Sequence, residues 1–249
     1  MPPPRAAVLL AAGEGRRLGG DKPLARLRGR PLAWYPLSVL HLLGAAEFAI
    51  VTRRGLAAEL RRLAESIAGP ASVLVVVNEE PWRENGYSLL LGLEALAAEA
   101  LVSMSDHVYS PLLAARVADT APRWSLYRVG CDREPCCVDL DEATKVLEAG
   151  GRVAAQSKSL RRWSCVDTGV HAAAPALLLR DAASLLSRRE NGVIRLNALV
   201  SLLGAMGAAS AAPAHGLPWL EVDTPEDLEA AEKGGNRWVV DHVLAWLHA

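Results

Sequence analysis

Several features are scarce in this chain of 249 residues, and each scarcity excludes a class of protein. The net charge is only −1, from 27 Lys and Arg against 28 Asp and Glu, so no broad positive field favours nucleic acid and any anion site must be local. No apolar run approaches the roughly 20 residues that span a bilayer. We therefore expect a cytoplasmic protein that binds no nucleic acid and does not enter a membrane by itself.

Cysteine is also rare. The four cysteines stand at positions 131, 136, 137 and 165, too few for a disulfide framework in a chain of this length. No paired Cys-x-x-Cys spacing is present, which argues against a zinc site, and we predict reduced thiols. Phenylalanine occurs once, whereas alanine is abundant and Arg outnumbers Lys. That composition is typical of a GC-rich genome and compatible with a thermophilic source.

What the first half does contain is a regular alternation of apolar runs and helical patterns. The runs are rich in Val, Ile and Leu and predict buried strands, and the segments between them show helical spacing. The predicted strands are 5–12, 48–53, 72–78 and 100–106, and the predicted helices are 32–44, 55–69 and 86–100. This order predicts a Rossmann-like α/β fold of three layers around a mixed, mostly parallel sheet.

The second half begins with short apolar segments separated by turns. They predict an antiparallel extension that forms one side of the ligand-binding crevice, which in such sheets lies beyond the carboxyl ends of the parallel strands. The predicted strands are 124–130, 136–140, 144–158 (two strands) and 163–173, followed by helices at 175–189 and 195–207 and a strand at 219–224. Thr224 is predicted to cap a helix with Pro225 in its first position. A last helix, about 236–249, packs on the core or on a second subunit, so a homodimer is one of two arrangements it allows. We predict a single domain over 1–249.

The loop after the first strand, "LAAGEGRRLGGDKPL" (10–24), is rich in glycine and positive charge. A dinucleotide fingerprint needs a third glycine where Leu18 stands, and a Walker A loop needs Ser or Thr where Pro23 stands. Glycines let backbone N–H groups face phosphate oxygens without an intervening Cβ, and Arg16 and Lys22 add positive charge. The sequence therefore predicts a polyanion site beyond the carboxyl end of this strand.

Four segments, in this order, resemble the motifs of GT-A-fold nucleotidyltransferases of the MobA-like NTP transferase superfamily. The loop at 10–24 with "GRPL" (29–32) resembles the signature Leu-Ala-Ala-Gly-x-Gly-x-Arg-Leu, then Lys-Pro and Gly-x-Pro-Leu. "MSDHVYSP" (104–111) is similar to the segment with the metal-binding Asp, "VDTGVH" (166–171) to the acceptor segment, and "WLEVDTPEDLEAAE" (219–232) to the late Asp segment. The resemblance covers nearly the whole chain. It implies nucleotide transfer from a nucleoside triphosphate to a phosphorylated small molecule.

A fifth segment narrows the resemblance. "ENGYSLLLG" (84–92) resembles the base-recognition segment of cytidylyltransferases that act on polyol or choline phosphates. The whole pattern is most similar to CTP:inositol-1-phosphate cytidylyltransferases, which implies CTP and inositol 1-phosphate as substrates, Mg²⁺ as cofactor and CDP-inositol as product. CDP-inositol is a precursor of the osmolyte di-myo-inositol phosphate. Because many relatives carry a fused membrane CDP-alcohol phosphotransferase, the resemblance also implies that a separate enzyme of that kind receives the product.

The resemblance assigns roles to residues of this sequence. Arg16, Lys22 and Lys158 are implied to be catalytic, and Asp106 and Asp223 to bind Mg²⁺. The nucleotide-binding residues that it implies are Leu10, Ala11, Ala12, Gly13, Glu14, Gly15, Asn78, Asn85, Ser88 and Ser105. The acceptor-binding residues that it implies are Lys145, Asp167, Thr168 and Gly169. Both substrates are anionic, so we expect catalysis by positioning and charge neutralisation rather than by a strong general base.

Some of these residues have a second interpretation. Lys158 stands in a turn and could be a solvated surface lysine, while Asn85 and Ser88 could cap the helix that follows them. Asp167 alternates with its neighbours along a strand and could point into the sheet instead. A lone histidine is more often structural, so His107 is left out of the catalytic set.

Three rival functions stay open. "LGGDKPL" (18–24) resembles the first loop of molybdenum cofactor nucleotidyltransferases, although segment 84–92 and the antiparallel section do not fit them. A sugar- or choline-phosphate nucleotidyltransferase is the second rival. A choline site calls for an aromatic cage, and only Trp163 stands near the acceptor segments. A nucleotide-binding relative without turnover is the third, but the loop cations and both metal aspartates are present, which favours an active enzyme.

Overall fold

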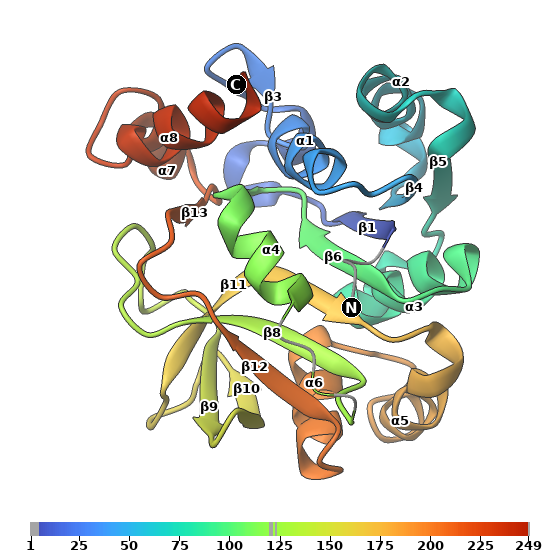
Figure 1. The fold of residues 1–249 in the computed structure, drawn as a ribbon. Helices are drawn as coiled ribbons and strands as arrows, with labels where there is room; N and C mark the ends of the chain where they lie inside the picture. The colour runs from blue at the N-terminus through green and yellow to red at the C-terminus, as the bar shows by residue number, and fades with distance from the viewer. Residues whose placement is uncertain (1–4, 120–121, 123, 249) are drawn as a thin grey trace.

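The computed structural model of the protein describes residues 5–119, 122 and 124–248. Within these residues the centre is a nine-stranded sheet in the order β5-β4-β1-β6-β11-β8-β12-β10-β9 (Figure 1). Its strands are β1 (Ala6–Ala11), β4 (Glu47–Thr52), β5 (Val73–Val77), β6 (Ala100–Met104), β8 (Tyr127–Asp132), β9 (Lys145–Ala149), β10 (Arg152–Ser157), β11 (Cys165–Ala173) and β12 (Ala209–Pro213). Two small sheets stand beside it, formed by β2 (Arg26–Leu27) with β3 (Arg30–Pro31) and by β7 (His107–Tyr109) with β13 (Trp219–Glu221).

The first half of the sheet is parallel, as the apolar runs predict. Leu9 of β1 stands opposite Ile50 of β4 and Ser103 of β6, and β5 joins the outer edge in parallel. All six residues of β1 are buried, since both faces of this part of the sheet are covered. The carboxyl ends of β1 and β6 therefore meet at one edge, where the glycine loop and the Asp106 segment both begin.

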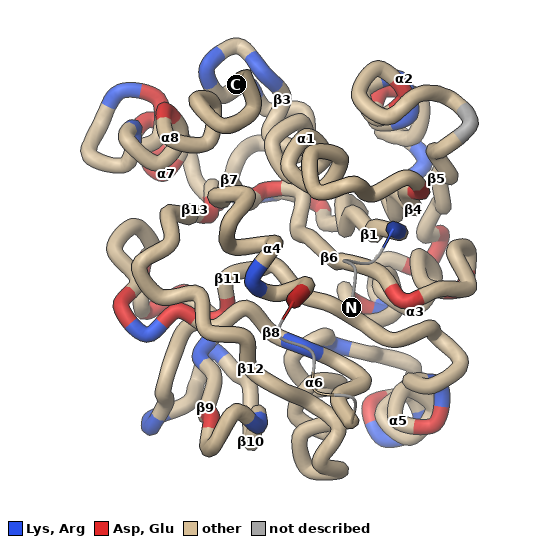
Figure 2. The backbone as a smooth tube through the Cα atoms, viewed as in Figure 1, with Lys and Arg blue, Asp and Glu red and all other residues tan. Residues whose placement is uncertain are grey.

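Helices cover both faces of the sheet and give three layers (Figure 1). The helices are α1 (Trp34–Leu42), α2 (Ala57–Ala68), α3 (Glu84–Leu96), α4 (Pro111–Asp119), α5 (Ala176–Arg189), α6 (Leu196–Ala205), α7 (Pro225–Glu232) and α8 (Arg237–Leu247). One core, around Leu9 and Phe48, is closed by α1, α2, α4 and α8, and the other, around Val8 and Leu93, by α3, α5 and α6. Figure 2 shows charged residues mainly on the surrounding helices and loops, with few along the central strands.

The second half of the sheet closes on itself. β11 pairs antiparallel with β6 and β8, and also with β9, the last strand in the order. The strands β11, β8, β12, β10 and β9 therefore form a ring, and α6 packs against β10. The β11–β8 register shifts between Asp167 and His171, an irregularity of the kind that re-aims side chains beside functional sites. The predicted antiparallel extension is confirmed, and its closure into a ring was not predicted.

One predicted strand, 136–140, is wrong. The chain turns there because the carboxylate of Asp139 accepts the N–H of Asp141 at 2.9 Å and its carbonyl accepts the N–H of Ala143 at 2.9 Å. The elements α4, β7 and β12 were not predicted.

The start of α7 matches its prediction. Thr224 accepts the N–H of Asp227, and the Asp227 side chain completes a capping box, with Pro225 in the first position. The predicted last helix is observed as α8, whose described part ends at Leu247, and residue 249 of the prediction lies outside the described residues. In the described part of the chain, no helix is both long enough and apolar enough to cross a bilayer.

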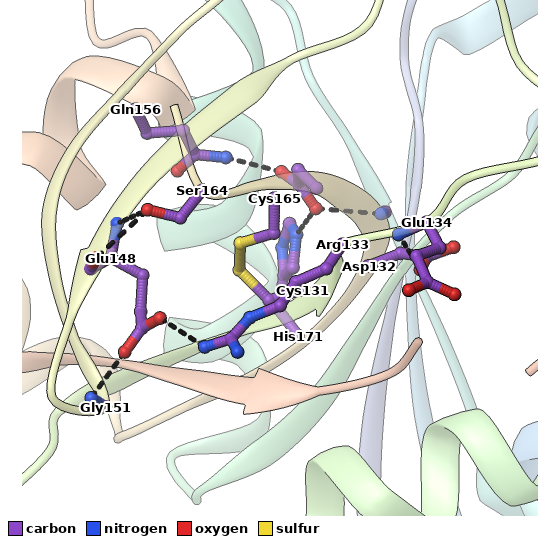
Figure 3. The surroundings of a disulfide bond; sticks show 12 residues. Cys131, Asp132, Arg133, Glu134, Glu148, Gly151, Gln156, Ser164, Cys165 and His171 are labelled. Atoms are coloured by element: carbon purple, nitrogen blue, oxygen red, sulfur yellow. Dashed lines mark hydrogen bonds and ion pairs between the residues drawn. A yellow bond between two sulfur atoms is a disulfide. The ribbon is translucent and has the colours of Figure 1, made fainter. Parts of the chain in front are cut away.

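The prediction of reduced thiols is wrong. The structure pairs Cys131 with Cys165 and Cys136 with Cys137 in disulfides. β8 and β11 are antiparallel neighbours, which brings the Cα atoms of Cys131 and Cys165 to 5.5 Å, within the range that a disulfide requires (Figure 3). A count of cysteines carries no information on which strands become neighbours, so the sequence does not reveal this pair.

Candidate active site

The loop after β1 folds back on itself and returns Lys22 to the end of the strand. The carbonyl of Gly15 accepts the N–H groups of Leu18 and Gly20, both at 3.1 Å, and the Lys22 N–H donates to the Gly20 carbonyl at 2.7 Å. Gly15 has φ 62°, and a Cβ there would lie 2.3 Å from the Gly20 oxygen. Only glycine fits this position. Gly15 therefore allows the loop to fold back and also leaves the backbone open to a ligand.

A two-stranded ladder brings two distant aspartates to the same place. β7 follows Asp106 and β13 ends shortly before Asp223, and the two strands pair antiparallel. The N–H of Val222 extends the ladder by donating to the Asp106 carbonyl at 3.0 Å. The Lys22 ammonium forms ion pairs with both aspartate carboxylates. The structure thus brings together one residue that the resemblance implies to be catalytic and the two that it implies to bind Mg²⁺.

This cluster of Lys22, Asp106 and Asp223 is largely withdrawn from solvent, with side-chain exposures of 11%, 19% and 16%. Burial would lower the pKa of Lys22, but the charges of Asp106 and Asp223 raise it above its usual value. Burial would raise the pKa of Asp106, but the Lys22 charge and a hydrogen bond with His107 hold it below its usual range. Lys22 and Asp106 are therefore charged at neutral pH.

A cavity of about 360 Å³ opens on one side of the cluster. It is lined by Leu10, Ala12, Gly13, Gly15, Arg16, Arg17, Lys22, Pro23, Asn78, Pro81, Glu84, Asn85, Ser88, Met104, Ser105, Asp106 and Asp223. Asn78 donates to Ser88 Oγ at 2.9 Å, and Asn85 Oδ1 accepts the N–H of Leu196, the first residue of α6, at 2.9 Å. Asn85 and Ser88 lie inside α3, which has no side-chain cap, so the interpretation of these residues as caps of that helix does not hold.

A second cavity, of about 240 Å³, lies on the other side of the same cluster. Arg17, Asn85, Met104, Asp106 and Asp223 line both cavities and form the wall between them. The remaining lining residues are His107, Ala143, Thr144, Lys158, Asp167, Gly169, Trp219 and Glu221. The two cavities therefore meet at both aspartates of the cluster, while Lys22 lines the first cavity alone. Two adjoining cavities of this kind suit two anionic substrates that react where they touch.

His107 and Glu221 lie side by side in the second cavity. Burial alone would lower the pKa of His107, but its hydrogen bond to Asp106, at 2.8 Å, and the charges of Glu221 and Asp106 raise it to about 8. Burial raises the pKa of Glu221 to about 7, against the charge of His107. Ligand atoms of Asp106, His107 and Glu221 lie within 4.8 Å of one another, so this group could hold a metal ion. Gly169 has φ 69°, and its close neighbour is the His107 ring, 2.4 Å from where a Cβ would stand.

A buried chain of hydrogen bonds holds Asp167 in place. The Tyr127 hydroxyl lies 2.7 Å from His171 Nδ1, and His171 Nε2 lies 2.7 Å from Asp167 Oδ1. Burial raises the pKa of Tyr127 well above its usual value, so the hydroxyl keeps its proton and can donate to Nδ1, which leaves Nε2–H to donate to Asp167. The Gln156 amide donates to the other carboxylate oxygen, and the Gly169 N–H donates to Oδ1 at 2.8 Å. These contacts fix the orientation of Asp167 at the cavity.

Most residues that the sequence analysis assigned to the site line one of the two cavities. Lys158, Asp167 and Gly169 line only the second, and the four that line neither are Ala11, Glu14, Lys145 and Thr168. The side chains of Ala11 and Thr168 are buried, and Thr168 faces Gly130 of β8. Glu14 pairs with Arg16 at the surface, and Lys145 donates to the Lys158 carbonyl at 3.0 Å.

Arg17 and Glu221 are among the lining residues that the sequence did not lead us to assign. Arg17 lines both cavities and pairs with Asp223, whereas the Arg16 side chain is 83% exposed. The family signature could have located it, because in Gly-x-Gly-x-Arg-Leu the arginine before leucine is Arg17. Glu221 stands two residues before Asp223, and alternate residues of an extended segment share a face, which could have indicated its place beside the cluster.

Comparison with known proteins agrees with this geometry. The sequence profile of the MobA-like NTP transferase domain matches residues 7–163, more than half of the chain. The chain belongs to the MobA-like NTP transferase family. The matched part of the chain includes the glycine loop, Lys22 and Asp106, and Asp223 lies beyond it.

Relatives and solved structures extend the match to nearly the whole chain. Two proteins named bifunctional IPC transferase and DIPP synthase are similar to it. The one from Thermococcus kodakarensis is 31% identical over 92% of this chain and 50% of its own length. The one from Archaeoglobus fulgidus is 35% identical over 91% of this chain and 43% of its own length, so the chain spans about half of these relatives. The inositol-1-phosphate CTP transferase from T. maritima shares the fold, with a TM-score of 0.79 and 23% identity over 96% of both chains.

Proposed function

We propose that this MobA-like domain is a CTP:inositol-1-phosphate cytidylyltransferase, which transfers CMP from CTP to inositol 1-phosphate and releases pyrophosphate. The observation that carries the proposal is the meeting of two cavities at Asp106 and Asp223, which both pair with Lys22. The names of the relatives and of the T. maritima structure support this choice of substrates. CTP occupies the first cavity and the acceptor occupies the second.

The chemistry joins two anions, so charge is the main barrier. An acceptor phosphate oxygen forms a bond to the α-phosphorus of CTP as the bond to pyrophosphate breaks, and a phosphate monoester is already ionised and needs no general base. Lys22 keeps its charge at neutral pH and, with Arg16 and Arg17, balances the triphosphate and the departing pyrophosphate. Asn85 and Ser88, at the start of α3, face the cytosine. Positioning in two adjoining cavities supplies the rest of the rate enhancement.

The cluster also fits a divalent metal ion, which enzymes of this kind generally use. The carboxylates of Asp106 and Asp223 both contact the Lys22 ammonium, so they already face a common cationic position. Mg²⁺ prefers one or two carboxylates together with phosphate oxygens, and we assign these two residues to it. When bound, Mg²⁺ neutralises phosphate oxygens of the triphosphate. The neighbouring group with His107 is less suited to Mg²⁺, because imidazole nitrogen is a softer ligand.

A pyrophosphate-release assay tests the proposal and its rivals together. Each of the four nucleoside triphosphates is combined with inositol 1-phosphate, phosphocholine, glucose 1-phosphate or molybdopterin, with and without Mg²⁺. We expect release with CTP, inositol 1-phosphate and Mg²⁺, and CDP-inositol as the second product. Preference for another acceptor would replace the substrate assignment. No release with any combination would favour a nucleotide-binding protein without turnover.

The product of this reaction, CDP-inositol, requires an enzyme that consumes it. Because the relatives are named as bifunctional and are about twice as long, we propose that a membrane CDP-alcohol phosphotransferase has this role. Membranes containing such an enzyme should convert the CDP-inositol that the domain forms.

We also propose a homodimer through α8, whose Trp238 and Trp246 side chains are exposed. Light scattering should then give twice the chain mass of 26.5 kDa, and a monomer would overturn this part.

A further inference from the structure

The second cavity contains two carboxylates that the proposed chemistry does not use, Asp167 and Glu221. The oxygens of Asp167 already accept hydrogen bonds from His171, Gly169 and Gln156. In the part of the chain that the structure describes, no residue donates a hydrogen bond to the carboxylate of Glu221. A partly buried carboxylate that faces a cavity without a donor is costly unless a ligand supplies one.

Charges of both signs line this cavity. Arg17 belongs to the wall shared with the nucleotide cavity, and Arg17 and Lys158 both pair with Glu142, at 3.3 and 3.5 Å. Glu221 lies beside that wall, because ligand atoms of Asp106, His107 and Glu221 are within 4.8 Å of one another. The phosphate of the acceptor is attracted to Arg17 at the shared wall, where the reaction takes place. Hydroxyl groups next to that phosphate then lie within reach of Glu221.

From this arrangement we propose that Glu221 determines acceptor specificity by accepting hydrogen bonds from the hydroxyl groups of a phosphorylated polyol. The inference rests on the proposed function and assigns to Glu221 the recognition of the hydroxyl groups of the acceptor. A carboxylate offers two oxygens to neighbouring hydroxyl groups, and hydrogen bonds to a charged acceptor are stronger than those between neutral groups.

A cationic alcohol phosphate such as phosphocholine fits this cavity less well. A quaternary ammonium has no hydrogen to donate and is bound through the faces of several aromatic rings. Among the described lining residues the only ring of that kind is Trp219, which is 3% exposed. One of its faces stacks on His107, with ring centres 6.1 Å apart and planes at 3°, and its Nε1 donates to Asp132 at 2.7 Å. Trp219 is therefore a fixed wall rather than part of an open cage.

Kinetics with two acceptors test the proposal. Inositol 1-phosphate and cyclohexyl phosphate share a six-membered ring and a phosphate but differ in ring hydroxyl groups. In Glu221→Ala we expect the kcat/KM for inositol 1-phosphate to fall by roughly tenfold to a hundredfold, the effect of losing a hydrogen bond to a charged group. The kcat/KM for cyclohexyl phosphate should change little, and the KM for CTP should stay the same. Glu221→Gln keeps one oxygen that can accept a hydrogen bond. Its kcat/KM for inositol 1-phosphate should therefore fall less than that of Glu221→Ala.

Controls separate recognition from other roles. Glu229→Ala, at an exposed position of α7, should behave as the wild type with both acceptors. An equal loss with inositol 1-phosphate and cyclohexyl phosphate would show that Glu221 is merely structural. A shift in the Mg²⁺ concentration for half-maximal activity, with no change in the acceptor KM, would make Glu221 a metal ligand. A loss in Glu221→Gln as large as in Glu221→Ala would point to recognition of a cation. Each of these three results overturns the proposal.

Calorimetry keeps this inference separate from the proposed function. Binding of inositol 1-phosphate to the wild type and to Glu221→Ala is measured without turnover, in the presence of CMP and Mg²⁺. If the wild type releases no pyrophosphate but binds inositol 1-phosphate at least tenfold more tightly than Glu221→Ala does, the proposed function fails and the role of Glu221 stands. If the wild type turns over but the two proteins bind the acceptor equally, the role of Glu221 fails alone. Absence of any binding overturns both.

Discussion

The two cavities share a wall that includes Asp106 and Asp223 but are built in different ways. The first cavity, which we assign to the nucleotide and call the nucleotide cavity, is formed largely by the loop after β1 and the start of α3, with glycine backbone and short polar side chains. The second, which we assign to the acceptor and call the acceptor cavity, is formed by charged and aromatic side chains from β7, β11, β13 and the loops around them. The shape of the nucleotide cavity is set mainly by the course of the backbone. The acceptor cavity is defined by the side chains that the fold brings together.

This difference suits the two substrates. A triphosphate presents many equivalent oxygens. Backbone N–H groups and a few cations can bind them without distinguishing one oxygen from another. An acceptor must be distinguished from other small phosphates, which requires side chains of chosen type and position. Asp106 and Asp223 line both cavities and Lys22 pairs with both of them, so changes in this cluster should affect both substrates. Changes within one cavity should affect one.

The largest effect is expected from Asp106→Ala. Asp106 lies in the wall of both cavities and is one of the two proposed Mg²⁺ ligands, so metal-dependent turnover should be abolished. The measurement is pyrophosphate release against Mg²⁺ concentration, with chelation of the metal from the wild type as a parallel test. Asp119→Ala, at the end of α4, is the control. Residual activity with the metal dependence of the wild type would remove Asp106 from the metal site.

Lys22→Ala should lower kcat by about 10²–10³-fold, the usual loss when one fixed charge donor is removed from a developing anion. The fold should persist, although the two aspartate carboxylates then face each other without a cation unless Mg²⁺ is present. Steady-state kinetics and circular dichroism are measured together, with exposed Lys233→Ala as the control. A variant with normal kcat, or one that affects only the acceptor KM, would contradict a shared role.

The same contrast explains what the sequence could predict. The parallel half of the fold was predictable because β1, β4, β5 and β6 are continuous apolar runs with helices between them. β12 was missed because its sequence, Ala-Ser-Ala-Ala-Pro, contains none of the β-branched or aromatic residues typical of strands. The ring closed by β11 and β9, and the disulfide between Cys131 and Cys165, depend on strand neighbours that no local pattern records.

The nucleotide side of the site was likewise predictable, since its residues stand together in one loop and one helix start. The acceptor side was predicted less completely. Asp167 and Gly169 were found from a motif, but Thr168 between them points at Gly130 rather than at the cavity. Glu221 was missed because its partner strand, β7, is only three residues long and gave no signal of its own. Side chains gathered from several strands require the fold before they can be assigned.

A pair of glycine variants sharpens the comparison. Gly15→Ala and Gly169→Ala both place a side chain at positive φ, 62° and 69°, and both bring a Cβ within 2.4 Å of a neighbour, the Gly20 carbonyl oxygen or the His107 ring. Each should lower the free energy of unfolding by more than the roughly 1–2 kcal/mol that a left-handed backbone costs. Gly15→Ala should raise mainly the KM for CTP, and Gly169→Ala mainly the KM for the acceptor. Gly150→Ala, at φ 60° with no neighbour within 4 Å, controls for backbone strain alone. Equal effects on both substrates would show that the cavities are not independent.

The smallest expected effect is the change of folding stability with pH, which arises from two residues of the acceptor cavity. The pKa of His107 is raised from 6.5 to about 8, so its stabilising contribution is fully present below pH 6.5 and is lost as the pH rises through 8. The shift corresponds to about 2 kcal/mol. The pKa of Glu221 is raised from 4.5 to about 7, so its ionisation also disfavours the folded state as the pH rises through that range. Urea unfolding with a metal chelator should therefore show lower stability at pH 9 than at pH 6, and a smaller difference in His107→Gln. Stability that stays level or rises over this range would mean that His107 is neutral in the folded protein.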